Sequence, residues 1–264
     1  MFKKSMVVLT LAMILSTFST NSFVQAASSY IDKTNLRNGL VSINYNSKNK
    51  SAVRIEKGNQ KQDYILDGNN NFPLQFGDGE YTITVLENTN GNKYKQIEKE
   101  VFTLKSGNKN DVYLQSIQLI NWNNEMNAIK KAKELTKNSK TDKEKVTEIY
   151  NYIVKNISYD YNKASTVAKG YVPSIDDVLK SSKGICYDYS SLFAGMLRSI
   201  DIPTKLVMGN NSEIKEYHAW NEVYLKDIGE WIIIDTTYDV AMKKGNVSVP
   251  MIKNASQYKI EKQY

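Results

Sequence analysis

One cysteine, Cys186, and one histidine, His218, are the only residues of their kinds in the 264-residue chain. A thiol and an imidazole are the pair with which cysteine enzymes work, the thiolate as nucleophile and the imidazole as general base and acid. One residue of each kind cannot form an intrachain disulfide, a Cys/His zinc cluster or an iron–sulfur cluster. The two residues therefore favour nucleophilic chemistry over metal chemistry.

Cys186 is predicted to lie in the first turn of a helix. Gly184 gives the chain freedom to turn, and an apolar pattern with helical spacing follows until Asp201-Ile202-Pro203 ends it. The unpaired N–H groups and the macrodipole at a helix start both stabilise a thiolate. The alternative is an inert, buried cysteine that packs as a small apolar side chain.

His218 begins a strand-like stretch, 218–225, and a second strand-like stretch, 231–235, follows a turn at 227–229. Alternation places Asp235 on the face of Trp231 and Ile233, where a carboxylate is costly unless it has a partner. If the two strands pair, Asp235 can orient the imidazole of His218, as the third member of a catalytic triad does. Glu222 is the rival orienter, and a hydrogen-bonded core histidine is the alternative for His218.

The region 145–240 resembles the transglutaminase-like superfamily of cysteine acyltransferases and peptidases, which has a papain-like Cys-His-Asp core. The resemblance implies that Cys186 is the nucleophile, His218 the general base and acid, and Asp235 the orienter. Thr236 and Asp201 depart from the residues common in the family, Pro and Gly, and put only local turn geometry in doubt. The stretches that carry the resemblance are Gly184-Ile185-Cys186-Tyr187-Asp188-Tyr189-Ser190, Ile202-Pro203, His218-Ala219-Trp220-Asn221-Glu222-Val223 and Asp235-Thr236-Thr237.

Such chemistry also needs donors for the oxyanion of the tetrahedral intermediate. The backbone N–H of Cys186 is the natural first donor. Tyr159, Tyr161 and Tyr171 precede the helix, and Tyr171 is the favoured candidate for the second donor, although a packing role is the simpler interpretation of each. Trp220 is expected to wall the site and limit the access of water.

The elements around these residues indicate an α+β protein of two domains. Period-two segments separated by Asn-Gly and Asp-Gly turns predict a small all-β, Ig-like sandwich over residues 27–115. Helical spacing then predicts helices at 124–137 and, after the capping box Thr141–Glu144, at 141–157. Residues 116–264 are therefore predicted to be a transglutaminase-like domain in which the helix bearing the cysteine packs on an antiparallel sheet.

Residues 1–26 are predicted to be a secretory signal peptide. Lys3 and Lys4 precede a short apolar run from Met6 to Leu15, and Ala26 offers a small residue before the cleavage point. The protein is thus expected to be secreted, with no membrane span once the signal is removed. Loss of the two lysines lowers the formal net charge from +7 to about +5, which suits loose association with an anionic cell wall.

The predicted function is transfer of an acyl group from a Gln carboxamide or peptide amide, through a thioester at Cys186, to an amine, which would cross-link proteins. The alternatives are a cysteine peptidase or amidohydrolase acting on wall or extracellular peptides, and a non-catalytic binding module. The expected partners are protein or peptide substrates at the cell surface or outside the cell. Nucleic acid is not expected as a partner, because the lysines around 130–145 alternate with glutamates as on a solvated helix face. No cofactor or metal is implied, and a role for calcium stays open.

Overall fold

The computed structural model describes residues 29–68 and 70–264. They divide into two compact units, one with the described residues up to Val112 and the other from Tyr113 to Tyr264. The predicted signal peptide lies outside the described residues. An α+β architecture with antiparallel sheets and a cysteine-bearing helix is confirmed.

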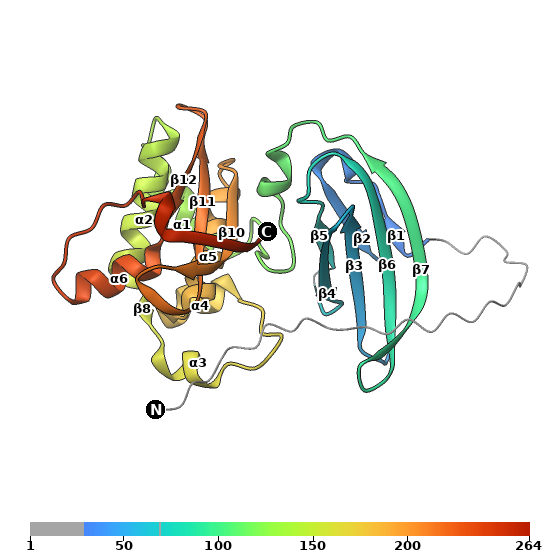
Figure 1. The fold of residues 1–264 in the computed structure, drawn as a ribbon. Coiled ribbons are helices and arrows are strands. Elements are labelled where there is room, and N and C mark those ends of the chain that lie inside the picture. The colour runs from blue at the N-terminus through green and yellow to red at the C-terminus, as the bar shows by residue number, and fades with distance from the viewer. Residues whose placement is uncertain (1–28, 69) are drawn as a thin grey trace, which may run out of the picture. The chain divides into compact units, whose positions relative to one another are not determined.

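The N-terminal unit consists of two antiparallel sheets, drawn in blue to green in Figure 1. One sheet has the strand order β1-β2-β5 and the other the order β4-β3-β6-β7. A short 3₁₀ turn, Leu36–Asn38, joins β1 to β2. The strands are β1 (Ile31–Asp32), β2 (Leu40–Ile43), β3 (Ser51–Lys57), β4 (Gln60–Ile65), β5 (Asn71–Pro73), β6 (Gly79–Asn90) and β7 (Lys93–Leu104).

The two sheets of this unit bury their apolar faces against each other. Tyr64 of β4 and Phe72 of β5 belong to different sheets, and their ring centroids lie 4.9 Å apart. The fully buried Tyr81 of β6 donates a hydrogen bond of 2.9 Å from its hydroxyl to the backbone oxygen of Leu74, which follows β5. These contacts make the unit a β-sandwich.

β7 is much longer than the segment 101–104 that the sequence predicts. It spans twelve residues from Lys93 and pairs with β6 along its length. The apolar pattern misses its first half because the half-buried positions Glu98 and Glu100 carry charge where alternation would show apolar residues. Gly91, in the turn between the strands, has a φ of +55°, a conformation that glycine adopts without steric cost.

The C-terminal unit combines helices with one four-stranded antiparallel sheet of order β12-β11-β10-β13 (Figure 1). A 3₁₀ turn, Asp111–Leu114, leads into it. Its elements are α1 (Asn127–Thr136), α2 (Asp142–Asn156), β8 (Ser158–Tyr159), α3 (Tyr161–Thr166), α4 (Ile175–Ser181), β9 (Lys183–Gly184), α5 (Cys186–Arg198), β10 (Thr204–Asn211), β11 (Ile214–Leu225), β12 (Glu230–Ile234), α6 (Thr236–Lys244), the 3₁₀ turn Ala255–Gln257 and β13 (Tyr258–Gln263).

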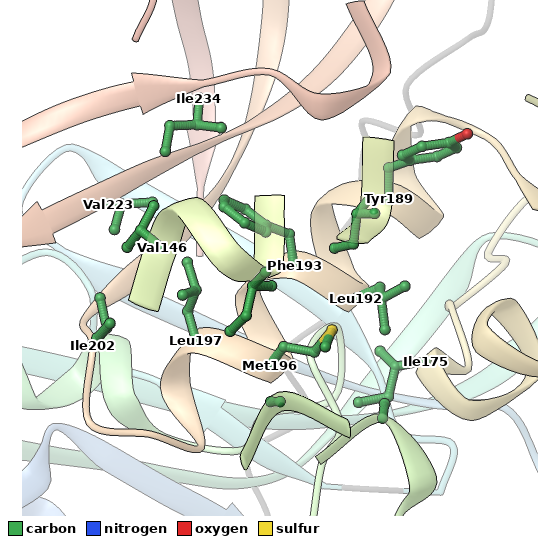
Figure 2. Packing of buried hydrophobic residues seen from close by; sticks show 14 of the residues in the cluster. Val146, Ile175, Tyr189, Leu192, Phe193, Met196, Leu197, Ile202, Val223 and Ile234 are labelled. Carbon is green, nitrogen blue, oxygen red and sulfur yellow. The ribbon is translucent and has the colours of Figure 1, made fainter. Parts of the chain in front are cut away.

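The apolar core of this unit lies between the helices and the sheet. Figure 2 shows Leu192, Phe193 and Leu197 of α5 among side chains of neighbouring elements. Val223 of β11 and Ile234 of β12 enter the same cluster from the sheet. α5 is thus fixed along its length, which in turn fixes the position of its first residue.

Two local sequence signals are borne out at the helix ends. Thr141 and Glu144 form the predicted capping box at the start of α2. After α5, Asp201 has a φ of +64°, in the left-handed region where glycine, asparagine and aspartate are tolerated best. Aspartate can therefore make the turn for which related sequences often use glycine.

Arg198, at the end of α5, is fully buried and joins three distant segments. Its guanidinium donates to the backbone oxygens of Thr204, Gln115 and Tyr264 at 2.8, 2.7 and 3.0 Å. Burial lowers its pKa to about 9. The cation therefore ties the start of the unit, the start of β10 and the end of the chain to one helix.

We expect Arg198→Met to lower the free energy of unfolding of the C-terminal unit by about 3–5 kcal/mol, because three buried carbonyls lose their donor. Urea unfolding followed by tryptophan fluorescence measures this, since Trp122, Trp220 and Trp231 all lie in this unit. Lys226→Met is the matched control, because this exposed lysine bonds one backbone oxygen, that of Asp201. Equal losses in the two variants would contradict the prediction.

Candidate functional site

Cys186 is the first residue of α5, and its side chain is partly exposed. The first N–H groups of a helix have no partner within the helix, so the backbone N–H of Cys186 can donate to a ligand. The sulfur also lies at the positive end of the helix dipole. The chain thus places its one thiol where a thiolate is stabilised and can be reached.

Asp188 holds the start of this helix in place. It is fully buried, and its carboxylate accepts a hydrogen bond of 2.8 Å from the backbone N–H of Ile185, closing the first turn. The ammonium of Lys163 lies 2.7 Å from the same carboxylate, and the hydroxyl of Tyr171 donates to it at 2.5 Å. The turn that carries Cys186 is therefore fixed by a buried, multiply bonded anion.

Gly184 is needed for close packing and not for an unusual backbone angle. A Cβ atom at this position would lie 2.7 Å from the Cβ of Asp188, which is closer than real Cβ contacts allow. The expectation that Gly184 supplies freedom to turn is corrected, because its φ is not positive. Any side chain here would displace the buried carboxylate that caps α5.

His218 and Asp235 form a buried pair. His218 lies in β11, Asp235 follows β12 as the N-cap of α6, and β11 and β12 pair in antiparallel register. The imidazole Nε2 lies 2.8 Å from Oδ2 of Asp235, and the side chains are 5% and 0% exposed. The two strands thus bring together a base and a carboxylate that are 17 residues apart in the sequence.

The protonated form of His218 is favoured in this site. Burial lowers the pKa of the imidazole, but the charge and hydrogen bond of Asp235, together with a hydrogen bond and charge from Cys186, raise it to about 10. Since Nε2 is bonded to Asp235, Nδ1 is the nitrogen left for the thiol. At neutral pH the site therefore contains an imidazolium between a carboxylate and the sulfur of Cys186.

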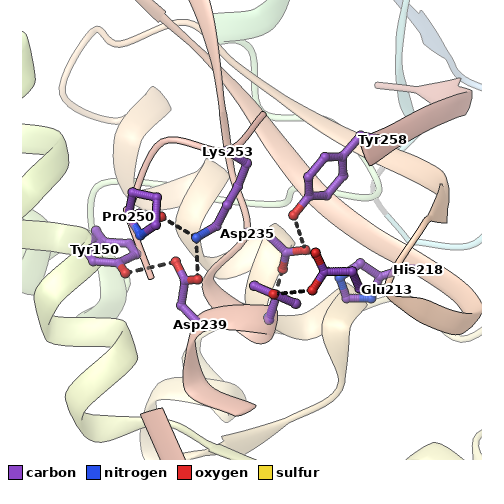
Figure 3. A network of polar contacts seen from close by, with 9 residues as sticks. Tyr150, Glu213, His218, Asp235, Asp239, Pro250, Lys253 and Tyr258 are labelled. Atoms are coloured by element: carbon purple, nitrogen blue, oxygen red, sulfur yellow. Dashed lines mark hydrogen bonds and ion pairs between the residues drawn. The ribbon is translucent and has the colours of Figure 1, made fainter. Parts of the chain in front are cut away.

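Both carboxylate oxygens of Asp235 accept hydrogen bonds, and Figure 3 shows the side chains around it. Its Oδ2 also accepts a hydrogen bond of 3.1 Å from the hydroxyl of Tyr258 in β13, and its Oδ1 accepts one of 2.9 Å from the backbone N–H of Tyr238. Burial and then the charge of Asp235 raise the pKa of the Tyr258 hydroxyl. Tyr258 thus stays protonated and donates to the carboxylate that orients His218.

Trp220 covers the imidazole from one side. Its ring is nearly parallel to that of His218, with the centroids 6.3 Å apart, and it contacts Tyr258 at 5.0 Å. The side chain is 1% exposed, and its Nε1 has no hydrogen-bond partner among the described residues. Trp220 therefore places a buried aromatic ring beside His218.

The three tyrosines ahead of α5 lie in different surroundings. Tyr171 gives its hydroxyl proton to Asp188 and accepts from Lys163 at 2.6 Å, so an oxyanion role would require this donor to leave Asp188. Tyr159 pairs with Gly184 across β8 and β9, and after burial the charge of Cys186 is the main cause that raises the pKa of Tyr159 to about 12. Tyr161 is 65% exposed.

Neighbouring charged residues are engaged elsewhere. Glu222, the rival orienter, pairs with Lys205 at 2.8 Å. Asp239, one turn after Asp235, is bonded to the ammonium of Lys253 and to the hydroxyl of Tyr150 (Figure 3). Burial raises the pKa of Asp239 to about 6, against the lowering effect of these two partners.

Sequence reasoning missed Asp188 and Tyr258. Asp188 could have been found, because an acidic residue three positions after the N-cap is the second half of a capping box. Tyr258 gives no such signal, since a lone tyrosine in a short strand 23 residues after Asp235 has no motif around it.

No group of three or more His, Cys, Asp or Glu side chains that could hold a metal is found within residues 29–68 and 70–264. In the same part of the chain, every helix is too short or too polar to cross a membrane.

Comparison with known protein families gives one match, and it covers the region that contains Cys186, His218 and Asp235. Residues 129–236 match the profile described as the transglutaminase-like superfamily. No curated protein sequence matches the chain significantly.

Several solved structures match this chain at low sequence identity. A proposed cysteine protease from Cytophaga hutchinsonii has 18% identity and a TM-score of 0.40, over 58% of this chain and 50% of that one. LapG from Legionella pneumophila has 14% identity and a TM-score of 0.37, over 51% and 66%. The periplasmic domain of TgpA from Pseudomonas aeruginosa has 14% identity and a TM-score of 0.41, over 84% and 97%. The chain thus spans 50% of the Cytophaga protein, 66% of LapG and 97% of the TgpA domain.

Proposed function

We propose that the protein is a cysteine acyltransferase, because residues 129–236 match the profile of the transglutaminase-like superfamily. In this proposal Cys186 forms a thioester with a Gln carboxamide or a peptide amide and then passes the acyl group to an amine. The observation that carries the proposal is the buried His218–Asp235 pair, with 2.8 Å between Nε2 and Oδ2, beside the thiol at the start of α5.

The first step breaks the C–N bond of the amide. The Cys186 thiolate attacks the carbonyl carbon and forms a C–S bond, and the carbonyl oxygen takes the negative charge. When the intermediate collapses, the His218 imidazolium gives its proton to the departing nitrogen, which leaves as ammonia or an amine. The raised pKa of His218, about 10, keeps this proton on the imidazole at neutral pH.

The second step reverses the roles. The now neutral imidazole takes a proton from the incoming amine as the amine attacks the thioester, and the sulfur leaves as a thiolate. Water could replace the amine, which would give hydrolysis. The buried ring of Trp220 beside His218 supports the amine as acceptor, because a wall that limits water slows hydrolysis of the thioester.

The oxyanion has one donor from the backbone N–H of Cys186, and we propose the hydroxyl of Tyr159 as the second. Tyr159 interacts electrostatically with Cys186, and with its pKa raised to about 12 it stays protonated at neutral pH. Its hydroxyl is also free of the bonds to Asp188 and Lys163 that Tyr171 makes. Tyr159 therefore fits the role better than the tyrosine that the sequence favours.

We expect Tyr159→Phe to lower kcat by about 100-fold with a small change in KM, because one oxyanion donor is lost. Steady-state kinetics of amine incorporation measure this. Tyr161→Phe is the matched control, since this exposed tyrosine touches Tyr159 edge-on, with centroids 4.9 Å apart. A wild-type kcat in Tyr159→Phe would show that the hydroxyl of Tyr159 takes no part in the reaction.

The proposed reaction is tested by incubating the protein with a glutamine-rich protein and a fluorescent primary amine. Labelled, uncleaved product that disappears in Cys186→Ala supports acyl transfer to amines. Cleaved peptides without label, again lost in Cys186→Ala, would show a peptidase or amidohydrolase instead. Unchanged substrates and a thiol that resists alkylation would leave the protein as a binding module.

We further propose that the protein acts outside the cell, on protein or peptide substrates at the cell surface. Support comes from the basic and then apolar stretch at the start of the sequence and from the formal charge of about +5 that remains without residues 1–26, which favours contact with anionic wall polymers. Cell fractionation tests the location, with recovery in the cytosol as the contradicting result.

A further inference from the structure

The N-terminal sandwich contains a polar cavity of about 670 Å³. It is lined by the end of β2, by residues of the loop between β2 and β3, by residues 66–68 and 70, and by the start of β5. We propose that this cavity binds a neutral carbohydrate, a short stretch of an oligosaccharide or polysaccharide. The proposal does not depend on the chemistry of Cys186, because every lining residue belongs to the N-terminal unit.

The lining side chains are mostly amides and hydroxyls. Five are asparagines and three are serines, and a primary amide offers two donors and an acceptor within one small group. Carbohydrate hydroxyls also donate and accept, so amides and hydroxyls match them at nearly every position. The residues are Asn44, Asn46, Asn49, Asn70, Asn71, Ser42, Ser47 and Ser51.

One of these amides lacks a partner. Oδ1 of Asn70 is buried and accepts no hydrogen bond from any described residue. A buried acceptor without a donor costs free energy, and because solvent does not reach this atom, a ligand hydroxyl would bond it only after the side chain turns toward the cavity. Across β2 and β5, by contrast, the hydroxyl of Ser42 donates to Oδ1 of Asn71 at 2.6 Å, which fixes that side of the cavity.

The segment that forms the rim is held in shape before any ligand arrives. Glu87 of β6 is 6% exposed and accepts hydrogen bonds from the hydroxyls of Tyr45 and Ser47. Lys95 balances its charge at 2.8 Å, and Lys95, Ser47 and Tyr45 together lower the pKa of Glu87 to about 2. The ring of Tyr45 packs edge-on against Tyr30, with centroids 5.0 Å apart. A preorganised rim reduces the entropy lost on binding.

The charge of the lining selects the ligand class. Asp67 is the one carboxylate on the lining, and neither lysine nor arginine contributes to it, which disfavours phosphates and acidic polymers. One carboxylate is too few for a divalent cation that prefers six to eight oxygen ligands. Ile43 and Leu66 are the aliphatic lining residues, which is too small an apolar surface for a lipid. A neutral, polyhydroxylated ligand remains, and Tyr45 adds an aromatic side chain to the lining.

The test uses the full chain, isothermal titration calorimetry, and two neutral probes, cellotetraose and chitotetraose. We expect saturable binding of at least one probe, weakened tenfold or more in the double variant Asn44→Ala/Asn46→Ala, because several hydrogen bonds are lost. Both side chains are exposed, so the variant should fold, and an unchanged thermal unfolding curve verifies this. Asn92→Ala, an exposed asparagine in the β6–β7 turn outside the cavity, is the matched control.

Three outcomes would overturn the proposal. The first is that neither probe binds saturably at millimolar concentration. The second is that the double variant and the control bind the probes equally well. The third is that an anionic heparin tetrasaccharide binds more tightly than both neutral probes. Amide chemical shift changes in ¹⁵N-labelled protein locate the ligand independently. Shifts confined to residues 42–51 and 66–71 support the cavity, and shifts confined to the C-terminal unit contradict it.

Discussion

Asparagine in place of Asp235 is expected to lower kcat/KM for amine incorporation by about 10³–10⁴-fold, the largest effect that we foresee for a change that keeps the shape of the side chain. Asp235 is the hydrogen-bond partner of Nε2 of His218 and the main cause that raises the pKa of this imidazole. An amide removes the negative charge and no longer favours the imidazolium. The acid that protonates the leaving nitrogen is then scarce at neutral pH.

The same variant should change the titration of His218 in a way that can be observed directly. His218 is the only histidine in the chain, so a tag-free protein gives one set of imidazole resonances in ¹⁵N NMR spectra. The pKa should be near 10 in the wild type and should fall in Asp235→Asn to below the ordinary value of about 6.5, because burial then dominates.

This shift also predicts a dependence of stability on pH. The pKa of His218 is higher in the folded state than in the unfolded state, so its ion pair contributes fully below about pH 6.5, and the contribution is lost as the pH rises through about 10. The wild type should therefore lose more stability than Asp235→Asn between pH 6 and pH 10 in urea unfolding.

Asp239→Asn is the matched control for Asp235→Asn. Asp239 is also a buried aspartate of the same segment, but its partners are Lys253 and Tyr150 and not His218. This change should lower stability, because Lys253 keeps a buried charge without its counter-ion. It should leave the pKa of His218 raised. A similar loss of kcat/KM and a similar fall of the His218 pKa in both variants would mean that Asp235 acts through the fold alone.

The second large effect concerns the thiol. We expect His218→Ala to slow the alkylation of Cys186 by iodoacetamide about 10- to 30-fold at pH 7. In the wild type the imidazolium next to the sulfur favours the nucleophilic thiolate, and alanine removes this cation.

Alkylation rates measured by mass spectrometry between pH 6 and pH 9 test this, and the single cysteine makes the modified site unambiguous. Glu222→Gln is the control, since Glu222 lies on the same strand as His218 but pairs with Lys205. If His218→Ala reacts as fast as the wild type at pH 7, the imidazole does not act on the sulfur. This result would contradict the proposed pairing of Cys186 with His218.

The main elements of the site could be predicted because each has a strong local signal. A turn followed by helical spacing indicated the helix that begins at Cys186, and strand-like alternation on both sides of a short turn indicated β11 and β12. The pairing of these strands follows from the turn between them. The distance of 2.8 Å between His218 and Asp235 is thus a consequence of a hairpin, the least ambiguous of long-range contacts.

The contacts that support the site were beyond such reasoning. Tyr258 reaches Asp235 because β13 pairs with β10, which precedes it by about fifty residues, and no sequence pattern specifies that partner. Tyr171 and Tyr159 differ only in what surrounds them in space. The hydroxyl of Tyr171 is bonded to Asp188, whereas Tyr159 interacts electrostatically with Cys186, and sequence position alone does not distinguish these surroundings.

The pairing of β13 with β10 has a consequence for the order of events during synthesis. Cys186, His218 and Asp235 are all made before residues 258–263, so a growing chain holds its nucleophile, base and carboxylate before the edge strand that carries Tyr258 exists. Chains are made from the N-terminus, and a contact between distant segments forms late. The reactive centre is therefore expected to mature only after this strand has docked on β10, later than the synthesis of the nucleophile, base and carboxylate themselves.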